Sequence, residues 1–281
     1  TASNNTAVGF SALVANTTGT RNTAVGSLAL DANTTGDDNT VVGQSAGSTI
    51  TTGHDNTLIG SYAGDNITTG GSNTALGTET LDATTTASNN TAVGYRAMQL
   101  NTTGASNVAV GFQALDANTT AANNTAVGSV ALGANTTGSS NIAVGGLALS
   151  SNTTAVQNTA VGFNCLRDTT TGASNVAVGE GAQIQSTTAQ QNVAIGRKAM
   201  FGNTTGSDNT ALGFEAGSAI QSGGNNICIG KKADAVHDSA NSITIGVGIT
   251  GVGNNFRFGK ASNTVTNVFT TNASFSRSSD V

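Results

Sequence analysis

The sequence has no proline and no tryptophan, and only 9% of its 281 residues are charged. Aromatic residues make up 4%, and the two cysteines are Cys165 and Cys228. Because large apolar side chains are too sparse for one compact core of this size, burial must be spread along an elongated molecule. Two cysteines without metal-ligand spacing exclude a disulfide framework and a cysteine metal site.

Basic residues are also scarce: the net charge is −5, and the basic residues are scattered singly along the sequence. This pattern predicts no electrostatic footprint for nucleic acid or for an anionic membrane. The sequence has no run of 18 apolar residues, and its start, TASNNTAVGF, lacks the basic and apolar regions of a signal peptide. We therefore expect no nucleic-acid partner and no membrane insertion.

Glycine, by contrast, recurs at a fixed interval of seventeen residues within the consensus NTAVGxxALxxNTTGxx. A slipped residue would turn inward side chains outward, so fourteen copies without an insertion indicate that each copy fills the same physical slot. The conserved glycines are Gly9, Gly26, Gly43, Gly60, Gly77, Gly94, Gly111, Gly128, Gly145, Gly162, Gly179, Gly196, Gly213 and Gly230.

The three residues before each glycine alternate as Thr, Val or Ile, then Ala in most copies, then Val, Ile or Leu. This period-two pattern predicts a short strand, and the glycine that follows suits a turn at positive φ. The repeat is too short for a helix beside its turns. The sequence therefore predicts an all-β parallel β-solenoid of about fourteen coils, seventeen residues and two or three short strands per coil, about 67 Å long at ~4.8 Å per coil.

Asparagine stands four residues before every conserved glycine. Identical amides stacked one above another can pass hydrogen bonds along the rod, which makes these residues and the glycines a structural ladder. Its members include Asn5, Asn22, Asn39, Asn56, Asn73, Asn90, Asn107, Gly9, Gly26, Gly43 and Gly60.

In a single coil of this composition, the free energy gained by burying side chains is close to the entropy cost of ordering the chain. This near balance favours further burial between chains. The alanines before the glycines, such as Ala7, Ala24 and Ala109, fit two arrangements equally well. Small side chains allow three chains to approach closely around an axis, and they also fit the narrow interior of one coil. We therefore expect a homotrimer, with the role of the alanine face left open.

Regularity ends after Gly230, because the next similar glycine, Gly246, follows one residue early. The region beyond it contains Phe256, Phe258, Phe269 and Phe275 in alternating order. We place a boundary near residue 240, between a solenoid shaft over residues 1–240 and a divergent β module over residues 241–281 that leads toward a missing C-terminal region.

The NTAVGxxAL repeats resemble the head repeats of trimeric autotransporter adhesins and, more closely, the NTAVG/NTTG arrays of bacteriophage tail fibres, over residues 4–246. The resemblance implies a left-handed parallel β-roll, a homotrimer, and a shaft that holds a host-binding tip away from a virion or cell surface. The terminal ASFSRSSDV is similar to the junction before an endosialidase-type intramolecular chaperone, which implies a processing junction at Ser279 and Asp280.

Five aromatic residues directly follow a conserved glycine: Phe10, Tyr95, Phe112, Phe163 and Phe214. Exposed rings at a turn suit contact with a host glycan or another fibre or baseplate protein, and they also suit packing against a neighbouring chain. We treat all five as candidate binding residues.

The sequence offers no catalytic, metal or cofactor site. His54 and His237 are eleven coils apart, and the repeated aspartates Asp31, Asp65, Asp82 and Asp116 occupy like slots without a cleft-building insertion. We therefore expect a structural fibre protein of a phage tail, not an enzyme.

The alternatives are a bacterial surface adhesin and, less favoured, an ice-binding or a carbohydrate-active solenoid. Adjacent threonines such as Thr17 and Thr18 are expected to point to opposite faces, whereas an ice-binding array needs them on one face.

Overall fold

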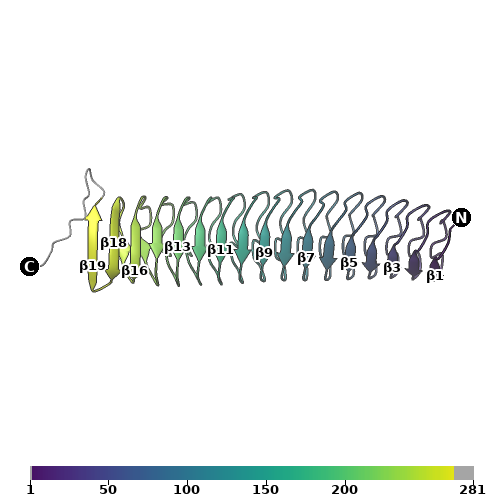
Figure 1. Ribbon diagram of the computed structural model, residues 1–281, viewed down its shortest axis with the longest axis horizontal. Helices are drawn as coiled ribbons and strands as arrows, with labels where there is room; N and C mark the ends of the chain where they lie inside the picture. The colour runs from purple at the N-terminus through teal and green to yellow at the C-terminus, as the bar shows by residue number, and fades with distance from the viewer. Residues whose placement is uncertain (1, 269–281) are drawn as a thin grey trace, which may run out of the picture.

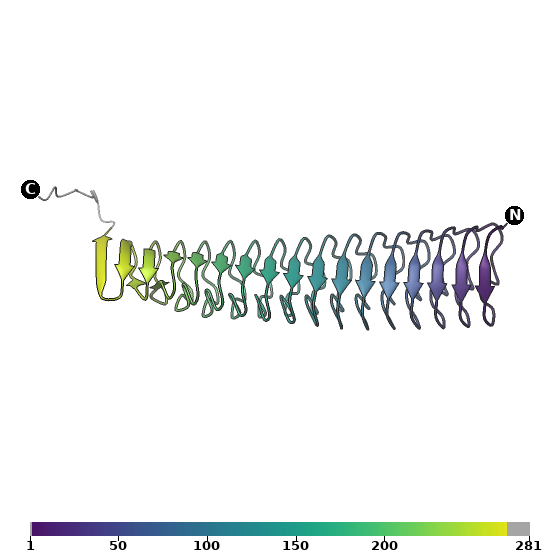
Figure 2. The same cartoon turned by 60° about the horizontal axis from the view of Figure 1, so that its bottom comes forward.

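The computed structural model describes residues 2–268, which form a straight stack of coils with the first and last described coils at opposite ends of the rod (Figure 1). The described residues contain strands and turns but no helix. Consecutive coils place their strands side by side in one long row (Figure 2). The predicted all-β parallel solenoid with seventeen residues per coil is confirmed.

Each seventeen-residue coil contributes one strand of three residues. These are β1 (Thr6–Val8), β2 (Thr23–Val25), β3 (Thr40–Val42), β4 (Thr57–Ile59), β5 (Thr74–Leu76), β6 (Thr91–Val93), β7 (Val108–Val110), β8 (Thr125–Val127), β9 (Ile142–Val144), β10 (Thr159–Val161), β11 (Val176–Val178), β12 (Val193–Ile195), β13 (Thr210–Leu212) and β14 (Ile227–Ile229).

The strands pair in parallel and in register, so that equivalent residues of successive coils lie side by side. Thr6 pairs with Thr23 and Ala7 with Ala24, and the same register continues to the pairing of Thr210 with Ile227. A parallel ladder with a constant offset of seventeen residues is what an uninterrupted seventeen-residue repeat requires.

The expectation of two or three strands per coil was wrong, because left-handed residues interrupt the rest of the coil. In the first complete coil, Ser11, Leu13 and Arg21 have φ values of 53°, 55° and 57°. A residue in this region cannot continue an extended strand. Equivalent positions are left-handed in coil after coil, so the chain beyond each strand is built from tight turns.

The conserved glycines end the strands for two reasons. Gly26 has a φ of 136°, a region that side chains disfavour. A Cβ at this residue would also lie 2.4 Å from the carbonyl oxygen of Gly43 in the next coil. Glycine is therefore required both by the local conformation and by the close stacking of neighbouring coils.

The interior of the rod is a narrow column of alanine and leucine. The middle residue of each strand from β2 to β14 is fully buried, as in Ala24, Ala109 and Ala160. Leucines four residues after the glycine, such as Leu115 and Leu132, are also fully buried. Because the alanines point into their own coil, the alternative that they form an interface between three chains is wrong.

The asparagines before the strands form a continuous buried ladder. The Oδ1 atom of one asparagine accepts the backbone N–H of the next at all thirteen steps between Asn5 and Asn226. The amide nitrogen of Asn107 donates to the carbonyl of Ala121 at 2.9 Å. These bonds satisfy backbone groups that the three-residue strands leave unpaired inside the rod.

Near residue 240 the coil shortens while the sheet continues. Gly246 follows Gly230 by sixteen residues and Gly259 follows Gly246 by thirteen, but β16 still pairs in parallel with β14 and with β18. The elements of this end are β15 (Asp234–Ala235), β16 (Ile243–Val247), β17 (Thr250–Gly251), β18 (Asn255–Lys260) and β19 (Asn263–Val268). β15 pairs with β17, and β19 closes the described part of the sheet by antiparallel pairing with β18.

Candidate functional site

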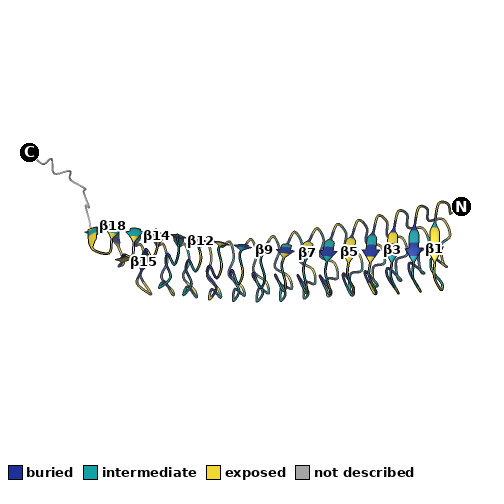
Figure 3. Ribbon diagram, turned by 90° about the horizontal axis from the view of Figure 1, so that it is seen from below, coloured by how far each residue is buried: buried dark blue, intermediate teal, exposed yellow. Residues whose placement is uncertain are grey.

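The outer side of the strand row is the most extended apolar surface of the rod. The first and third residues of β1–β14 and β16 point outward while the middle residue points inward, and we call these outward residues the strand face. Figure 3 shows buried strand centres flanked by intermediate or exposed residues. Every outward residue is Thr, Val, Ile or Leu, and none is charged.

Exposure on the strand face is high for side chains of this type. The third residue of the strand is 47% exposed in Leu76 and Leu212, and 37% exposed in Val144. The first residue is 43% exposed in Ile142. A charge-free apolar strip that runs the length of a protein exceeds the scattered exposed residues of an ordinary monomer.

The five aromatic candidates lie at the edge of the strand face, but the structure brings only two of them together. Tyr95 and Phe112 stack with ring centroids 5.9 Å apart, and the Arg96 guanidinium lies 5.1 Å from the centre of the Tyr95 ring. Phe10 and Phe163 are 77% and 54% exposed. Phe214 is half-buried between two basic side chains.

The four aspartates of the repeated slot form one column along the rod. Burial raises the pKa of Asp31, Asp82 and Asp116, and for Asp82 the charges of Asp65 and Glu79 raise it further. The column lies on a continuous outer surface, so it offers no enclosed site in which two carboxylates flank a substrate.

The histidines and cysteines do not meet. His54 pairs with its neighbour Asp55 at 2.8 Å, and Cys165 and Cys228 are both buried free thiols. Burial raises the pKa of each thiol to about 12. Within residues 2–268, no group of three or more His, Cys, Asp or Glu side chains is placed to hold a metal ion.

The adjacent threonines of the NTTG segment have different surroundings. The hydroxyl of Thr136 donates to the carbonyl of Thr153 in the next coil at 3.0 Å, and Thr119 and Thr153 make the same contact. The next residue, Thr137, is exposed. One threonine column therefore supports the stacking of coils and the other faces solvent.

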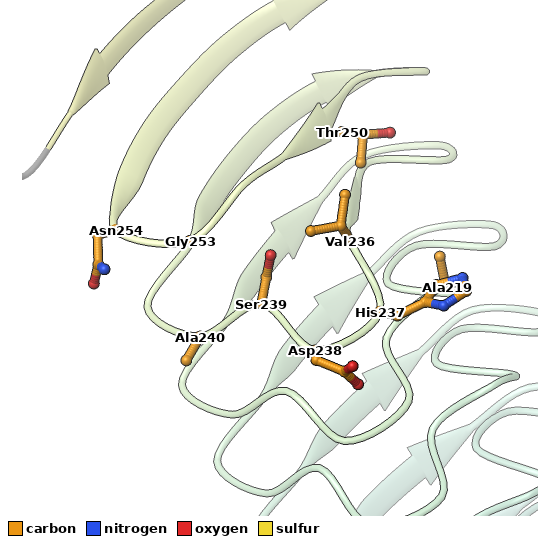
Figure 4. A pocket seen from close by; sticks show the side chains of 9 residues that line it. All are labelled: Ala219, Val236, His237, Asp238, Ser239, Ala240, Thr250, Gly253 and Asn254. Carbon is orange, nitrogen blue, oxygen red and sulfur yellow. The ribbon is translucent and has the colours of Figure 1, made fainter.

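A shallow open groove of about 800 Å³ lies where the coil shortens (Figure 4). His237 and Asn254 lie at opposite ends of it, and Val236, 43% exposed, forms part of its wall. Asp238 accepts a hydrogen bond from Ser222 at 2.6 Å. The polar groups of the groove do not converge on one point, so we assign it no ligand.

The basic residues were interpreted from the sequence as scattered singly, but the fold brings two pairs of them within two coils of each other. Arg197, Lys198, Lys231 and Lys232 directly follow two conserved glycines that lie two coils apart. Their clustering is visible only once the repeat is wound into coils, because 34 residues separate equivalent positions. The expected processing junction at Ser279 and Asp280 lies outside the described residues.

No protein-family model and no curated protein matches the chain. Over residues 2–268 there is also no helix with the length and apolar character needed to span a bilayer. The geometry of the rod therefore carries the functional argument.

Proposed function

We propose that this chain is a structural shaft, one protomer of a homotrimeric fibre that holds a binding tip away from a surface. The observation that carries the proposal is the strand face, an uncharged strip of Thr, Val, Ile and Leu that is half-buried or exposed along the stack of seventeen-residue coils. Burying this face between chains removes apolar area from water without taking any charge out of solvent.

The interior of the coil supports the same proposal. Inward-pointing side chains, mostly alanine and leucine, form the core of each coil, and the outward Val and Ile are not part of it. Threonine on the strand face combines a methyl group with a hydroxyl, which suits an interface that is flat and closely packed. The trimeric state itself is taken from the resemblance of the repeats to tail-fibre and adhesin arrays.

The favoured setting is a phage tail fibre on the virion, and a bacterial surface adhesin is the alternative. Both use a rod as a spacer, and the straight stack of coils supports that role in either case (Figure 1). The acidic column and the open groove lack the convergent groups that a catalytic role would need. We therefore propose no enzymatic activity.

The test is a mass measurement on the full chain at micromolar concentration, combined with its shape in solution. The proposal expects three copies of the 27.5 kDa chain in one elongated particle. A monodisperse 27.5 kDa species would overturn the trimeric shaft. A compact particle would instead contradict the rod.

A further inference from the structure

Four of the ten basic residues of the chain directly follow two repeat glycines that lie two coils apart, and two of the four lie against the Phe214 ring. Arg197 and Lys198 follow Gly196, and Lys231 and Lys232 follow Gly230 two coils later. The coil between them carries Phe214 and Glu215 at the same two positions. Arg197, Lys231 and Lys232 are exposed and Lys198 is half-buried. We call these four side chains the basic edge.

Contacts within the basic edge include two cations that lie against one aromatic ring. The Arg197 guanidinium lies 5.7 Å from the centre of the Phe214 ring, and the Lys231 ammonium lies 5.9 Å from the same centre. The two cations belong to the coils before and after that of Phe214. Cation–π contact offsets part of their mutual repulsion.

The acids nearby neutralise only half of the basic edge. Arg197 pairs with Glu180 at 2.9 Å and Lys232 pairs with Glu215 at 3.3 Å. In the described part of the chain, Lys198 and Lys231 form no ion pair. Lys198 instead lies 5.4 Å from the centre of the Phe201 ring. Two cations are thus left to attract an anion in a chain whose net charge is −5.

The spacing of the cations determines which polyanion they fit. The equivalent residues Arg197 and Lys231 are two coils apart, about 9.6 Å along the axis at ~4.8 Å per coil, and Lys198 adjoins Arg197 in the same coil. Phosphates of a DNA strand follow one another at about 3.4 Å along the duplex axis, which is much denser. An acidic polysaccharide with one carboxylate or sulfate per disaccharide carries its charges at a wider interval.

The surroundings of the cations also disfavour other anionic partners. Two cations lie within 6 Å of the centre of the Phe214 ring, where they compete with a nucleobase for stacking on it. A membrane surface requires a larger cluster of basic residues, because each contributes only about 1 kcal/mol.

We propose that the basic edge binds an acidic polysaccharide lying along the rod axis, with Lys198 and Lys231 as the principal anion contacts. This inference is independent of the trimeric state, since the basic edge lies wholly within one chain. The proposal gives the shaft a ligand of its own, whereas the resemblance to fibre repeats assigns binding only to the tip.

The experiment measures binding of the full chain to hyaluronan oligosaccharides, with neutral dextran as the uncharged probe. Wild type is expected to bind hyaluronan with an affinity that falls as salt rises from about 50 to 200 mM. Lys198→Gln/Lys231→Gln is expected to bind about tenfold more weakly at the lower salt. Arg21→Gln, a basic residue far along the rod, is the matched control and is expected to bind like wild type.

Folding is checked by the circular dichroism melting curve, which the double variant is expected to share with wild type because neither lysine forms an ion pair within residues 2–268. Arg197→Gln/Lys232→Gln serves as a second pair that removes the other two cations. Equal hyaluronan binding by wild type and both pairs would overturn the proposal. Binding of dextran as tight as hyaluronan would do the same, and so would tighter binding of duplex DNA or of phosphatidylserine vesicles.

Discussion

Gly217 and Ile220 share one packing volume inside the coil that begins at Gly213. A Cβ on Gly217 would lie 3.3 Å from the Cδ1 atom of Ile220. Most other coils have leucine or methionine at the first position and asparagine, threonine or serine at the second. Gly47 with Ile50 and Gly64 with Ile67 repeat the exchange. The isoleucine therefore fills the volume that leucine occupies elsewhere.

This exchange predicts strong coupling between the two positions. Ile220→Asn alone leaves a cavity and is expected to destabilise by about 3 kcal/mol. Gly217→Leu alone overpacks the coil and is expected to cost about 1 to 3 kcal/mol. The double variant restores the common pair, so its cost is expected to be smaller than the sum by about 1 to 3 kcal/mol. Urea denaturation of the four proteins measures the coupling, and additive costs would contradict shared packing.

The asparagine ladder predicts that a single interior amide is costly to remove. Asn107 accepts the backbone N–H of Asn124 at 2.9 Å and donates to the carbonyl of Ala121. Asn107→Ala is expected to lower the free energy of unfolding by about 2 to 4 kcal/mol, because it leaves two buried backbone groups unpaired. Chemical denaturation measures the loss.

The exposed Asn123, next to Asn107's partner, provides the matched control. Asn123→Ala removes an amide of the same size from the surface. Its left-handed φ of 61° accounts for any small cost, since alanine tolerates this conformation less well than asparagine. An equal loss in both variants would show that the ladder contributes nothing special.

The acidic column predicts greater stability in mild acid than at neutral pH. Burial raises the pKa of Asp82 and Asp116 above the ordinary value of 3.8, so folding favours their neutral forms. Their contribution is complete below the pKa of the unfolded chain and is lost as pH rises through the raised folded pKa. We therefore expect the melting temperature to rise as pH is lowered from about 7 toward the ordinary carboxyl pKa of 3.8.

Two other aspartates have lowered pKa values, and these affect stability only at more acidic pH. Hydrogen bonds from Thr20 lower the pKa of Asp37, and a hydrogen bond from Arg21 lowers that of Asp38, so their contributions are lost only as pH falls below 3.8. Asp82→Asn/Asp116→Asn is expected to flatten the rise in melting temperature as pH is lowered from about 7 toward 3.8. An unchanged slope in this variant would assign the pH dependence to other groups.

The buried thiols predict slow chemical modification. Burial raises the pKa of Cys165 and Cys228 to about 12, so very little thiolate is present at neutral pH. Iodoacetamide labelling followed by mass spectrometry is expected to leave both unmodified in the native rod and to label both in denaturant. Rapid labelling of the native protein would indicate that its coils open readily.

The repeat determined much of the fold in advance, for physical reasons that particular residues illustrate. An invariant spacing from Gly9 to Gly230 leaves one way to stack the coils, and the alternation of Thr, Ala and Val marks the strand. The number of strands was not predictable in the same way. Leu13 and Ser11 are left-handed, and nothing in these residue types favours positive φ; stacking imposes it.

The candidate surfaces were also predictable only in part. The two sides of the strand could be separated from the alternation alone, but which side lay inside could not, because alanine suits both a narrow coil and a close interface. The basic edge was missed because Arg197 and Lys231 are 34 residues apart in the sequence and two coils apart in space. Proximity of that kind becomes apparent when residues are compared by column along the rod.

The strand face predicts how the assembly responds to charge. Val127 and Val144, 36% and 37% exposed, project from it in adjacent coils, and Thr120 and Thr137 are exposed in the turns of the same stretch. Lysines on an interface would place like charges together without partners, whereas lysines in the turns remain solvated. Val127→Lys/Val144→Lys is therefore expected to dissociate, and Thr120→Lys/Thr137→Lys is the matched control.

The most direct test is the mass of these three proteins by sedimentation equilibrium, with circular dichroism to verify that each remains folded. The account predicts three times 27.5 kDa for wild type and for the threonine variant, and a folded 27.5 kDa monomer for the valine variant. A valine variant with the mass of the wild-type assembly, or a wild type that is itself monomeric, would contradict burial of the strand face between chains.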